Sequence, residues 1–346
     1  MTDNFLEMSI KDRYDALEQG RELTGRPAHL LEKDVWVVWA LKALFDSPGL
    51  TDLTFKGGTS LSKAYKVINR FSEDIDLTYD IRKLIPDLIQ GGAVLPRNRS
   101  QAKKWTKQIK GRLANWIKDT AQPAVQAALD HEGIVGAQLE LDRSESNKLL
   151  LRYPHVNKGT EYVAPVVTLE FGGRATGEPN SRMSVECDIA SQFTNVLFPT
   201  ASPVVMSIGR TFWEKATAAH AFCSKGSLKG ERYARHWHDL AAIWCSPHSN
   251  TIVADRDVAT AVAHNKSHFF VEKDIQGNDI DYHAAVSGHL KITPVGGFRA
   301  ALAEDYNTMI AEGILLDDSV TFDELMNVCA EIETVVNGIG VNGKPA

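Results

Sequence analysis

The chain has 346 residues, of which 43% are hydrophobic and 24% are charged. This balance is typical of globular proteins and excludes disordered, collagen-like and coiled-coil classes, and the length allows two ordinary domains or one large one. The longest uninterrupted apolar run, residues 35–41, has 7 residues, whereas a membrane-spanning helix needs about 20. The first residues lack the apolar core of a signal peptide, so we expect a cytoplasmic protein without a membrane segment.

Charge is distributed unevenly along the chain, whose formal net charge is −6. Residues 82–118 contain ten Lys or Arg and one acid, Asp87, whereas residues 300–343 contain nine acids and no Lys or Arg. Because binding to polyanions depends on local patches and not on net charge, the basic segment 82–118 predicts contact with nucleic acid. The alternative is an ordinary solvated helix face.

The cysteines and histidines give no metal or disulfide pattern. The four cysteines stand far apart and form no Cys-x-x-Cys pair: Cys187, Cys223, Cys245 and Cys329. This spacing predicts reduced thiols and favours neither a zinc ribbon nor a disulfide framework. His264 and His268 lie four residues apart on one predicted helix face, but no acid or cysteine accompanies them, so a zinc site is disfavoured.

Hydrophobic periodicity and turn residues predict a mixed first half and a helical second half. The predicted helices of the first half span 9–23, 30–45, 60–68 and 101–129, the last with a bend or a new helix at Pro123. The predicted strands span 53–56, 75–79, 137–141, 149–153, 163–171 and 184–189. Later helices are predicted at 211–223, 229–245, 256–265, 298–312 and 321–337. We therefore predict an α+β fold, with a mixed domain over 1–208 and a helical domain over 209–346.

The most informative stretch begins with Lys56-Gly57-Gly58-Thr59-Ser60, between a predicted strand and a predicted helix. Two glycines let the backbone approach a bound phosphate closely, and the first N–H groups of a helix attract an anion. Alone, this pattern is more often an ordinary turn followed by a helix cap.

Asp74 and Asp76 follow one helix later, two residues apart on a predicted strand. Side chains at i and i+2 of a strand project from the same face, and neighbouring carboxylates repel each other unless a cation lies between them. Oxygen ligands of this kind suit Mg²⁺, which also binds substrate phosphates. The alternative is a solvated strand end, but the combination with the diglycine turn favours a Mg²⁺ and nucleotide site.

Nucleotidyl transfer with two metal ions needs a third carboxylate from a neighbouring strand, because ions roughly 3.5–4 Å apart must be held together. Glu170 lies among the apolar residues of the predicted strand 163–171 and is the favoured candidate. Glu186 and Asp188, on the next predicted strand, remain open as alternatives.

Together these features resemble the nucleotidyltransferase superfamily and, more closely, the AbiEii/AbiGii (MenT-like) toxin family. The motifs that carry the resemblance are Leu31-Glu32-Lys33-Asp34, the 56–60 stretch, Arg70-Phe71-Ser72-Glu73-Asp74-Ile75-Asp76, Lys215, Arg235-His236-Trp237-His238-Asp239 and, more weakly, Asp305-Tyr306 with Met309. The resemblance implies a nucleotidyltransferase-like mixed β-sheet core flanked by helices. It also implies that the C-terminal helical domain contributes to the nucleotide site.

The resemblance implies roles for single residues. Asp74, Asp76 and Glu170 would hold Mg²⁺ and, with Lys215 and Asp239, would form the catalytic set. The residues that would bind the nucleotide are Gly57, Gly58, Thr59, Ser60, Lys63, Ser72, Lys215 and Arg235. In the segment Arg235-His236-Trp237-His238, many relatives have a sequence of the type Arg-x-Lys-Asp-Leu. The second basic position is a histidine here, so the charge there would depend on pH.

The residues alone leave plainer interpretations open. An isolated lysine such as Lys215 usually faces solvent on its helix, and Asp239 fits a surface acid paired with Arg235 one turn earlier. The tryptophans at 105, 116, 213, 237 and 244 favour core packing over base stacking.

We therefore expect a Mg²⁺-dependent nucleotidyltransferase toxin that moves an NMP from an NTP to an acceptor. By resemblance the acceptor is the 3′ end of tRNA, bound through segment 82–118, and its modification blocks translation. A cognate antitoxin would be the protein partner, and the acidic segment 300–343 either balances the basic charge or meets that antitoxin. Two rivals remain: NMP transfer to a protein Ser, Thr or Tyr, and an NTP-binding module without turnover.

Overall fold

The computed structural model describes residues 3–72, 74–89, 94–157, 164–227, 230–315 and 320–338. The chain forms two compact units. The first unit comprises Met1–Ala64, Ser72–Ile89 and Lys107–Val205, and the second unit comprises Tyr65–Phe71, Gln90–Thr106 and Met206–Ala346. The main division thus falls close to the predicted boundary at 209, but two short segments from the first half of the chain belong to the second unit.

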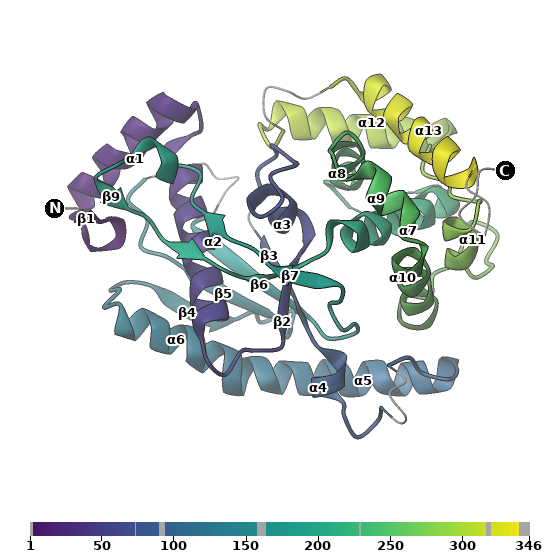
Figure 1. Cartoon of the computed structure of the whole chain (residues 1–346), viewed down its shortest axis with the longest axis horizontal. Coiled ribbons are helices and arrows are strands. Elements are labelled where there is room, and N and C mark those ends of the chain that lie inside the picture. Colours follow the sequence, from purple (N-terminus) through teal and green to yellow (C-terminus); the bar gives the residue numbers. More distant parts are fainter. Residues whose placement is uncertain are drawn as a thin grey trace. The chain divides into compact units, whose positions relative to one another are not determined.

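Among the described residues, a mixed sheet of seven strands forms the centre of the first unit, in the order β4-β5-β6-β3-β2-β11-β7 (Figure 1). These strands are β2 (Leu53–Lys56), β3 (Asp74–Tyr79), β4 (Gln138–Leu141), β5 (Lys148–Arg152), β6 (Val166–Gly172), β7 (Asn180–Arg182) and β11 (Val204–Met206). β3 pairs antiparallel with β2 and parallel with β6. The predicted mixed sheet is confirmed.

Helices flank this sheet, as predicted. They are α1 (Ile10–Thr24), α2 (Ala28–Asp46), α3 (Gly57–Lys63), α4 (Ile81–Leu84), α5 (Arg99–Trp116) and α6 (Gln122–His131). The boundary between the two units falls within α5. α2 packs against β3 and β6 (Figure 1). Its Trp36 and Trp39 side chains are buried, which explains the dense apolar pattern of this helix.

The sheet has an apolar face because its strands alternate. Ile75 of β3 lies beside Leu169 of β6, and Leu77 lies beside Phe171, and all four side chains are buried. The Trp116 ring of α5 packs edge-on against Phe171, with ring centroids 5.7 Å apart. The acidic residues that alternate with Ile75 and Leu77 therefore lie on the opposite face.

The second turn of α2 fastens the chain that leads into β6. The buried Glu32 carboxylate accepts the backbone N–H groups of Val156 (2.7 Å) and Asn157 (3.1 Å). The buried Lys33 ammonium donates to the carbonyl oxygen of Ala164 at 3.0 Å. Two residues of the Leu-Glu-Lys-Asp motif are thus structural anchors.

The predicted helix 101–129 is interrupted before Pro123. α5 ends at Trp116, a π-helical turn covers Ile117–Ala121, and α6 begins at Gln122. Proline has no N–H to donate to the carbonyl four residues earlier, and its ring crowds that carbonyl. The wider π turn accommodates both effects, so the sequence located the break.

The second unit is helical, as predicted. Its helices are α7 (Ile208–Lys225), α8 (Arg235–Trp244), α9 (Ser249–Ala254), α10 (Arg256–Phe269), α11 (Tyr282–Val286), α12 (Gly296–Ala311) and α13 (Phe322–Gly338). α7 contacts α8 and α10. Trp213 and Trp237 are fully buried in this core, whereas Trp244 is half-buried, so the predicted core role holds for the first two.

Two predicted elements have the wrong extent. α3 begins at Gly57 and ends at Lys63 instead of spanning 60–68. The predicted strand 184–189 is reduced to β8 (Val185–Glu186), which pairs with β10 (Thr200–Ala201) outside the main sheet. The strand stops because the N–H of Asp188 donates to the Asp34 carboxylate at 2.7 Å instead of to a neighbouring strand. Residues 163 and 229, at the ends of two predicted elements, lie outside the described residues.

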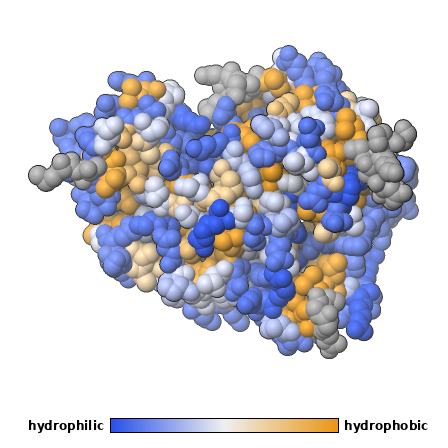
Figure 2. All heavy atoms as spheres, viewed as in Figure 1, coloured by the Kyte–Doolittle hydropathy of each residue, from blue (hydrophilic) through white to orange (hydrophobic). Residues whose placement is uncertain are grey.

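Two further short strands, β1 (Asp3–Asn4) and β9 (Val196–Leu197), pair with each other. On the face seen in Figure 2, hydrophilic and hydrophobic residues are interspersed. The exposed apolar side chains of Val135, Ile275 and Val295 lie on separate loops, which is ordinary for a folded protein. In the part of the chain that the structure describes, every helix is too short or too polar to span a bilayer.

The buried His220 of α7 predicts a loss of stability in acid. Its Nδ1 accepts the backbone N–H of Lys291 at 3.1 Å, and burial, with Lys291 nearby, lowers the pKa of His220 to about 4. The folded state therefore keeps this imidazole neutral while the unfolded chain takes up a proton below about pH 6.5. Between pH 7 and pH 5 we expect wild type to lose about 2 kcal/mol more unfolding free energy than His220→Asn.

Urea unfolding curves at the two pH values measure this difference. His131→Asn, which replaces an exposed histidine, is the matched control and should lose as much stability in acid as wild type. An identical pH dependence in wild type and His220→Asn would contradict the assignment.

Candidate active site

The polar face of the sheet carries a row of four charged side chains. Lys56 of β2 lies opposite Asp76 of β3, Asp76 lies beside Glu170 of β6, and Glu170 lies opposite Lys148 of β5. Asp74, the first residue of β3, is two residues from Asp76 and shares its face. The structure thus brings the three acids selected from the sequence onto one face of two neighbouring strands.

Gly57 fixes where the Asp76 carboxylate lies relative to α3. Its φ of 79° is in the left-handed region, which favours glycine. A Cβ at this position would lie 2.0 Å from Asp76 Oδ2, so any side chain here would displace the carboxylate. Within the described chain the N-cap residue Lys56 makes no side-chain hydrogen bond to α3, so the first N–H groups of this helix lack a side-chain cap.

The hydroxyl groups of the diglycine loop point into the protein. Thr59 Oγ1 lies 2.8 Å from Ser72 Oγ and also contacts the carbonyl oxygen of Asp74. Ser60 Oγ donates to the carbonyl oxygen of Gly57 at 2.8 Å. Thr59 and Ser60 are fully buried. The Thr59 hydroxyl joins the start of β3 to α3, whereas the Ser60 hydroxyl bonds within α3. Their predicted contact with nucleotide phosphates, like that of Gly58 and Ser72, stays a prediction.

The three candidates for the third acid lie in different surroundings. Glu170 is directly beside Asp76 in the sheet, and its Oε2 lies 3.5 Å from the Lys148 ammonium. Asp188 is paired with Arg26 (2.5 Å) and Lys63 (2.6 Å). Glu186 is exposed on β8, outside the main sheet. The register therefore favours Glu170 over the two alternatives.

The donor set on this face suits a hard divalent cation, because it offers carboxylate oxygens at i and i+2 of one strand with a further carboxylate on the next. Searched over the described ranges, however, no three His, Cys, Asp or Glu side chains form a closed metal-binding group. Glu170 Oε2 lies 3.5 Å from the Lys148 ammonium. His264, half of the disfavoured zinc pair, packs its ring on His283 at 4.5 Å.

Lys63 lies in a buried ion network next to this site. Its ammonium contacts the carboxylates of Asp34 and Asp188, each at 2.6 Å, and its side chain is 4% exposed. Burial opposes the charge, but Asp34 and Asp188 outweigh it and raise the pKa of Lys63. Lys63 therefore joins α3 to α2 and to the end of β8 as a permanent cation. Its predicted contact with the nucleotide is untested.

The second unit contains a buried cluster that joins two residues of the sequence motifs. Asp239 of α8 is 0% exposed and accepts two parallel hydrogen bonds from Arg70, from Nε (2.6 Å) and Nη2 (2.8 Å). The Lys215 ammonium of α7 lies 2.8 Å from Asp239 Oδ2. Burial alone would raise the pKa of Asp239, but Arg70 and Lys215 hold it well below its ordinary value.

This cluster overturns the plainer interpretations of Lys215 and Asp239. Lys215 does not face solvent, because its side chain is only 11% exposed and is paired with Asp239. Asp239 is paired with Arg70 and Lys215 instead of Arg235, which is exposed. Burial, assisted by Lys215 and Arg235, holds the pKa of His236 well below its ordinary value. His236 is therefore neutral near pH 7 and supplies no pH-dependent charge there.

Asp305, from the weak motif near the end of the chain, has a structural role. Its carboxylate accepts the backbone N–H groups of Arg232 (2.6 Å) and Ala234 (2.7 Å). Arg232 has a left-handed φ of 63°, an unusual conformation for a residue with a side chain. Asp305 thus fixes the entry into α8, the helix that carries Asp239.

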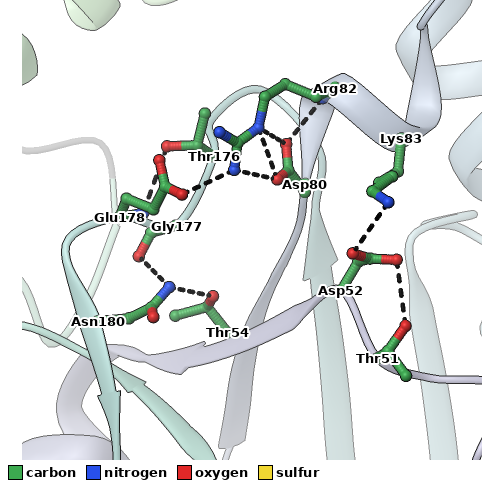
Figure 3. A network of polar contacts seen from close by, with 10 residues as sticks. All are labelled: Thr51, Asp52, Thr54, Asp80, Arg82, Lys83, Thr176, Gly177, Glu178 and Asn180. Atoms are coloured by element: carbon green, nitrogen blue, oxygen red, sulfur yellow. Dashed lines mark hydrogen bonds and ion pairs between the residues drawn. The ribbon is translucent and has the colours of Figure 1, made fainter.

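The basic segment 82–118 divides into paired and unpaired cations. Four are in ion pairs: Arg82 with Asp80 and Glu178, Lys83 with Asp52 (both in Figure 3), Arg99 with Asp279, and Arg112 with Asp87. The other six are exposed and make no ion pair with any described residue: Arg97, Lys103, Lys104, Lys107, Lys110 and Lys118.

The paired part of this segment is structural. Arg82 bridges Asp80, at the end of β3, to Glu178, and Asn180 donates to Thr54 of β2 (Figure 3). These contacts fasten the loop before β7 to the end of β3 remote from Asp74. The cations that remain available to a polyanion therefore lie at 97–118.

Sequence reasoning gave no role to two residues of these clusters, Arg70 and Lys148. Arg70 stands in a quoted motif, but its partner Asp239 is 169 residues away, so no local spacing signals the pair. Lys148 directly precedes the predicted strand 149–153, and sheet register brings it to Glu170. A polar residue at an otherwise apolar strand was the only available signal.

Two comparisons with known proteins find similar proteins. The profile of the family described as "Nucleotidyl transferase AbiEii toxin, Type IV TA system" matches residues 39–328. A solved structure, that of MenT4, a nucleotidyltransferase toxin from Mycobacterium tuberculosis H37Rv, aligns with 92% of this chain and 97% of its own, at 18% identity and a TM-score of 0.45. No curated protein gives a significant match.

The family match defines the class of protein: this chain is a nucleotidyltransferase. The family match covers most of the sequence, and the chain belongs to the AbiEii nucleotidyl transferase toxin family of type IV toxin–antitoxin systems. The resemblance stated from the motifs is confirmed. Membership implies an NTP substrate and an antitoxin partner, and it argues against a binding module without turnover.

The contact between Gly57 and Asp76 predicts a sharp effect of one methyl group. In Gly57→Ala the new Cβ would collide with the Asp76 carboxylate and would strain a left-handed backbone. We expect nucleotide transfer to fall at least about tenfold and the unfolding free energy to fall by about 1–3 kcal/mol. Gly49→Ala is the matched control, since a Cβ there meets nothing within 4 Å. Equal transfer rates in the two variants would contradict the geometry.

Proposed function

We propose that this protein transfers an NMP from an NTP to the 3′ end of an RNA, with tRNA as the acceptor, and thereby blocks translation. The observation that carries the proposal is the placement of Asp76 between Gly57 and Glu170. This placement puts acidic oxygen ligands beside a turn that phosphates can approach closely.

Asp74, Asp76 and Glu170 are the residues that would hold Mg²⁺. Bound there, the ion would neutralise phosphate charge and lower the pKa of the acceptor hydroxyl. Gly57 keeps the Asp76 carboxylate in position, and the buried Thr59 hydroxyl holds the start of β3 against α3. Rigid support of this kind lowers the cost of bringing the two reactants together.

The backbone of the diglycine loop would orient the triphosphate, because its side-chain hydroxyls are engaged within the protein. Lys215 would contact the phosphates and stabilise the charge that develops on the leaving pyrophosphate. Arg235, which is exposed at the start of α8, would add a second positive charge toward the nucleotide.

The lysines of α5 favour an RNA acceptor over a protein acceptor. Lys103, Lys107 and Lys110 recur at i, i+4 and i+7, so they form one stripe on the helix, and all three are exposed. Cations without internal partners neutralise phosphates readily and release counterions when they bind. NTP and tRNA are both cytoplasmic, so the proposed reaction places the protein in the cytoplasm with its antitoxin.

The transfer reaction is tested with α-labelled NTPs. Wild type is incubated with each NTP in turn, Mg²⁺ and total cellular RNA, and label is followed in RNA and in protein. We expect label in RNA of tRNA size, loss of labelling after periodate oxidation of the RNA 3′ ends, and loss with EDTA. Asp76→Asn should label at least about 100-fold less, since it removes a charge that supports metal binding.

Glu186→Gln is the control for Glu170→Gln. Glu170→Gln should lose transfer, and Glu186→Gln, on a separate pair of strands, should keep it. Label on protein alone would support NMP transfer to Ser, Thr or Tyr and would overturn the RNA proposal. Absence of any labelled product with every NTP would contradict nucleotide transfer itself.

The α5 stripe is tested by charge reversal. In Lys103→Glu/Lys107→Glu/Lys110→Glu we expect the KM for RNA to rise at least about tenfold and the dependence of RNA affinity on log salt to become shallower by about 2. The KM for NTP should not change. The control is Lys11→Glu, at an 84% exposed lysine of α1. RNA labelling equal to that of the control would exclude the stripe as the RNA-binding surface.

A further inference from the structure

Two cationic side chains of the second unit share the carboxylate of Asp239, and the three groups differ in access to solvent. The side chains of Asp239, Arg70 and Lys215 are 0%, 5% and 11% exposed. Both oxygens of Asp239 are occupied, Oδ1 by Arg70 Nε and Oδ2 by Arg70 Nη2 and Lys215 Nζ. The charges of these three side chains sum to +1, and the most accessible of the three is the lysine.

Asp239 cannot act directly on a substrate in this arrangement. A general base or metal ligand must reach the reacting atoms, whereas this carboxylate is enclosed and holds two cations. Its contribution to activity must then pass through Arg70 and Lys215. Asp239 is a positioning residue.

We propose that Arg70 serves as the counter-ion that lets Lys215 leave Asp239 and bind a nucleotide phosphate; this inference rests on the proposed function. Lys215 is a point charge with one contact to Asp239, at 2.8 Å. Arg70 holds the same carboxylate with two parallel N–H bonds, a geometry that a guanidinium forms and an ammonium does not. When Lys215 turns to a phosphate, Asp239 stays paired.

Without Arg70, the movement of Lys215 from Asp239 to a phosphate costs more free energy. Among the described residues, Lys215 would then be the one Lys or Arg paired with a fully buried carboxylate. A buried charge that loses its partner is strongly destabilising. His238 Nδ1, 3.3 Å from Asp239 Oδ1, is a weaker substitute for a guanidinium. Lys215 would therefore remain bound to Asp239, and the site would lose affinity for the anionic ligand.

The distinctive prediction is a rescue by a second substitution. Direct binding of NTP without acceptor is measured by titration calorimetry. We expect Arg70→Met to weaken NTP binding at least about tenfold relative to wild type. Arg70→Met/Asp239→Asn should bind NTP more tightly than Arg70→Met, because removal of the carboxylate releases Lys215. Arg70→Lys keeps the charge but cannot form the two parallel N–H bonds. Its NTP affinity should lie between those of wild type and Arg70→Met.

A merely structural role for Arg70 predicts no rescue of NTP binding by the second substitution. If Arg70 only stabilises the fold, the double variant should bind NTP no better than the single variant, and this result would overturn the proposal. If wild type binds no NTP, the result contradicts the proposed function itself. If wild type binds NTP and the rescue is missing, only the role of Arg70 fails.

A measurement on wild type alone covers the case in which Arg70→Met does not fold. Acylation of lysines by an amine-selective reagent is followed by mass spectrometry with and without NTP. We expect NTP to lower the labelling of Lys215 at least about threefold, because the ammonium then contacts phosphate, and to leave the exposed Lys11 unchanged. Equal labelling of Lys215 in both conditions would overturn the proposal.

Discussion

The parallel pairing of β3 with β6 is the interaction on which the site depends. Its register sets Asp76 beside Glu170, and the same register sets Ile75 beside Leu169 on the buried face. A slip of one residue would exchange the two faces and place carboxylates against the aromatic and aliphatic core. Burial of apolar side chains on one face thus fixes the positions of the charges on the other.

The sequence predicted what depends on local periodicity and on turn chemistry. Alternation identified β3 and the face shared by Asp74 and Asp76, and the lack of an N–H in Pro123 located the break after α5. Local patterns contain no information on ion pairs between distant segments. The partners of Lys215 and Asp239 were therefore missed or wrongly assigned, since Arg70 is 169 residues from Asp239.

Charge counting along the chain had a similar limit. Residues 82–118 contain ten basic residues, but Arg82, Lys83, Arg99 and Arg112 are paired with acids. Exposed pairs of this kind add little stability, yet they reduce the charge that a polyanion meets. What remains is a narrower set of lysines on α5, which is a more specific surface than the composition implied.

The division of the second unit along the chain has a consequence for the timing of synthesis. This unit includes Tyr65–Phe71 as well as Met206–Ala346, so Arg70 leaves the ribosome long before Asp239 is made. At ordinary elongation rates the 169 intervening residues take roughly 10–30 s. A nascent chain lacks the buried charge cluster throughout that interval, so translation of the toxin must pass residue 239 before the cluster can form and any dependent activity can begin.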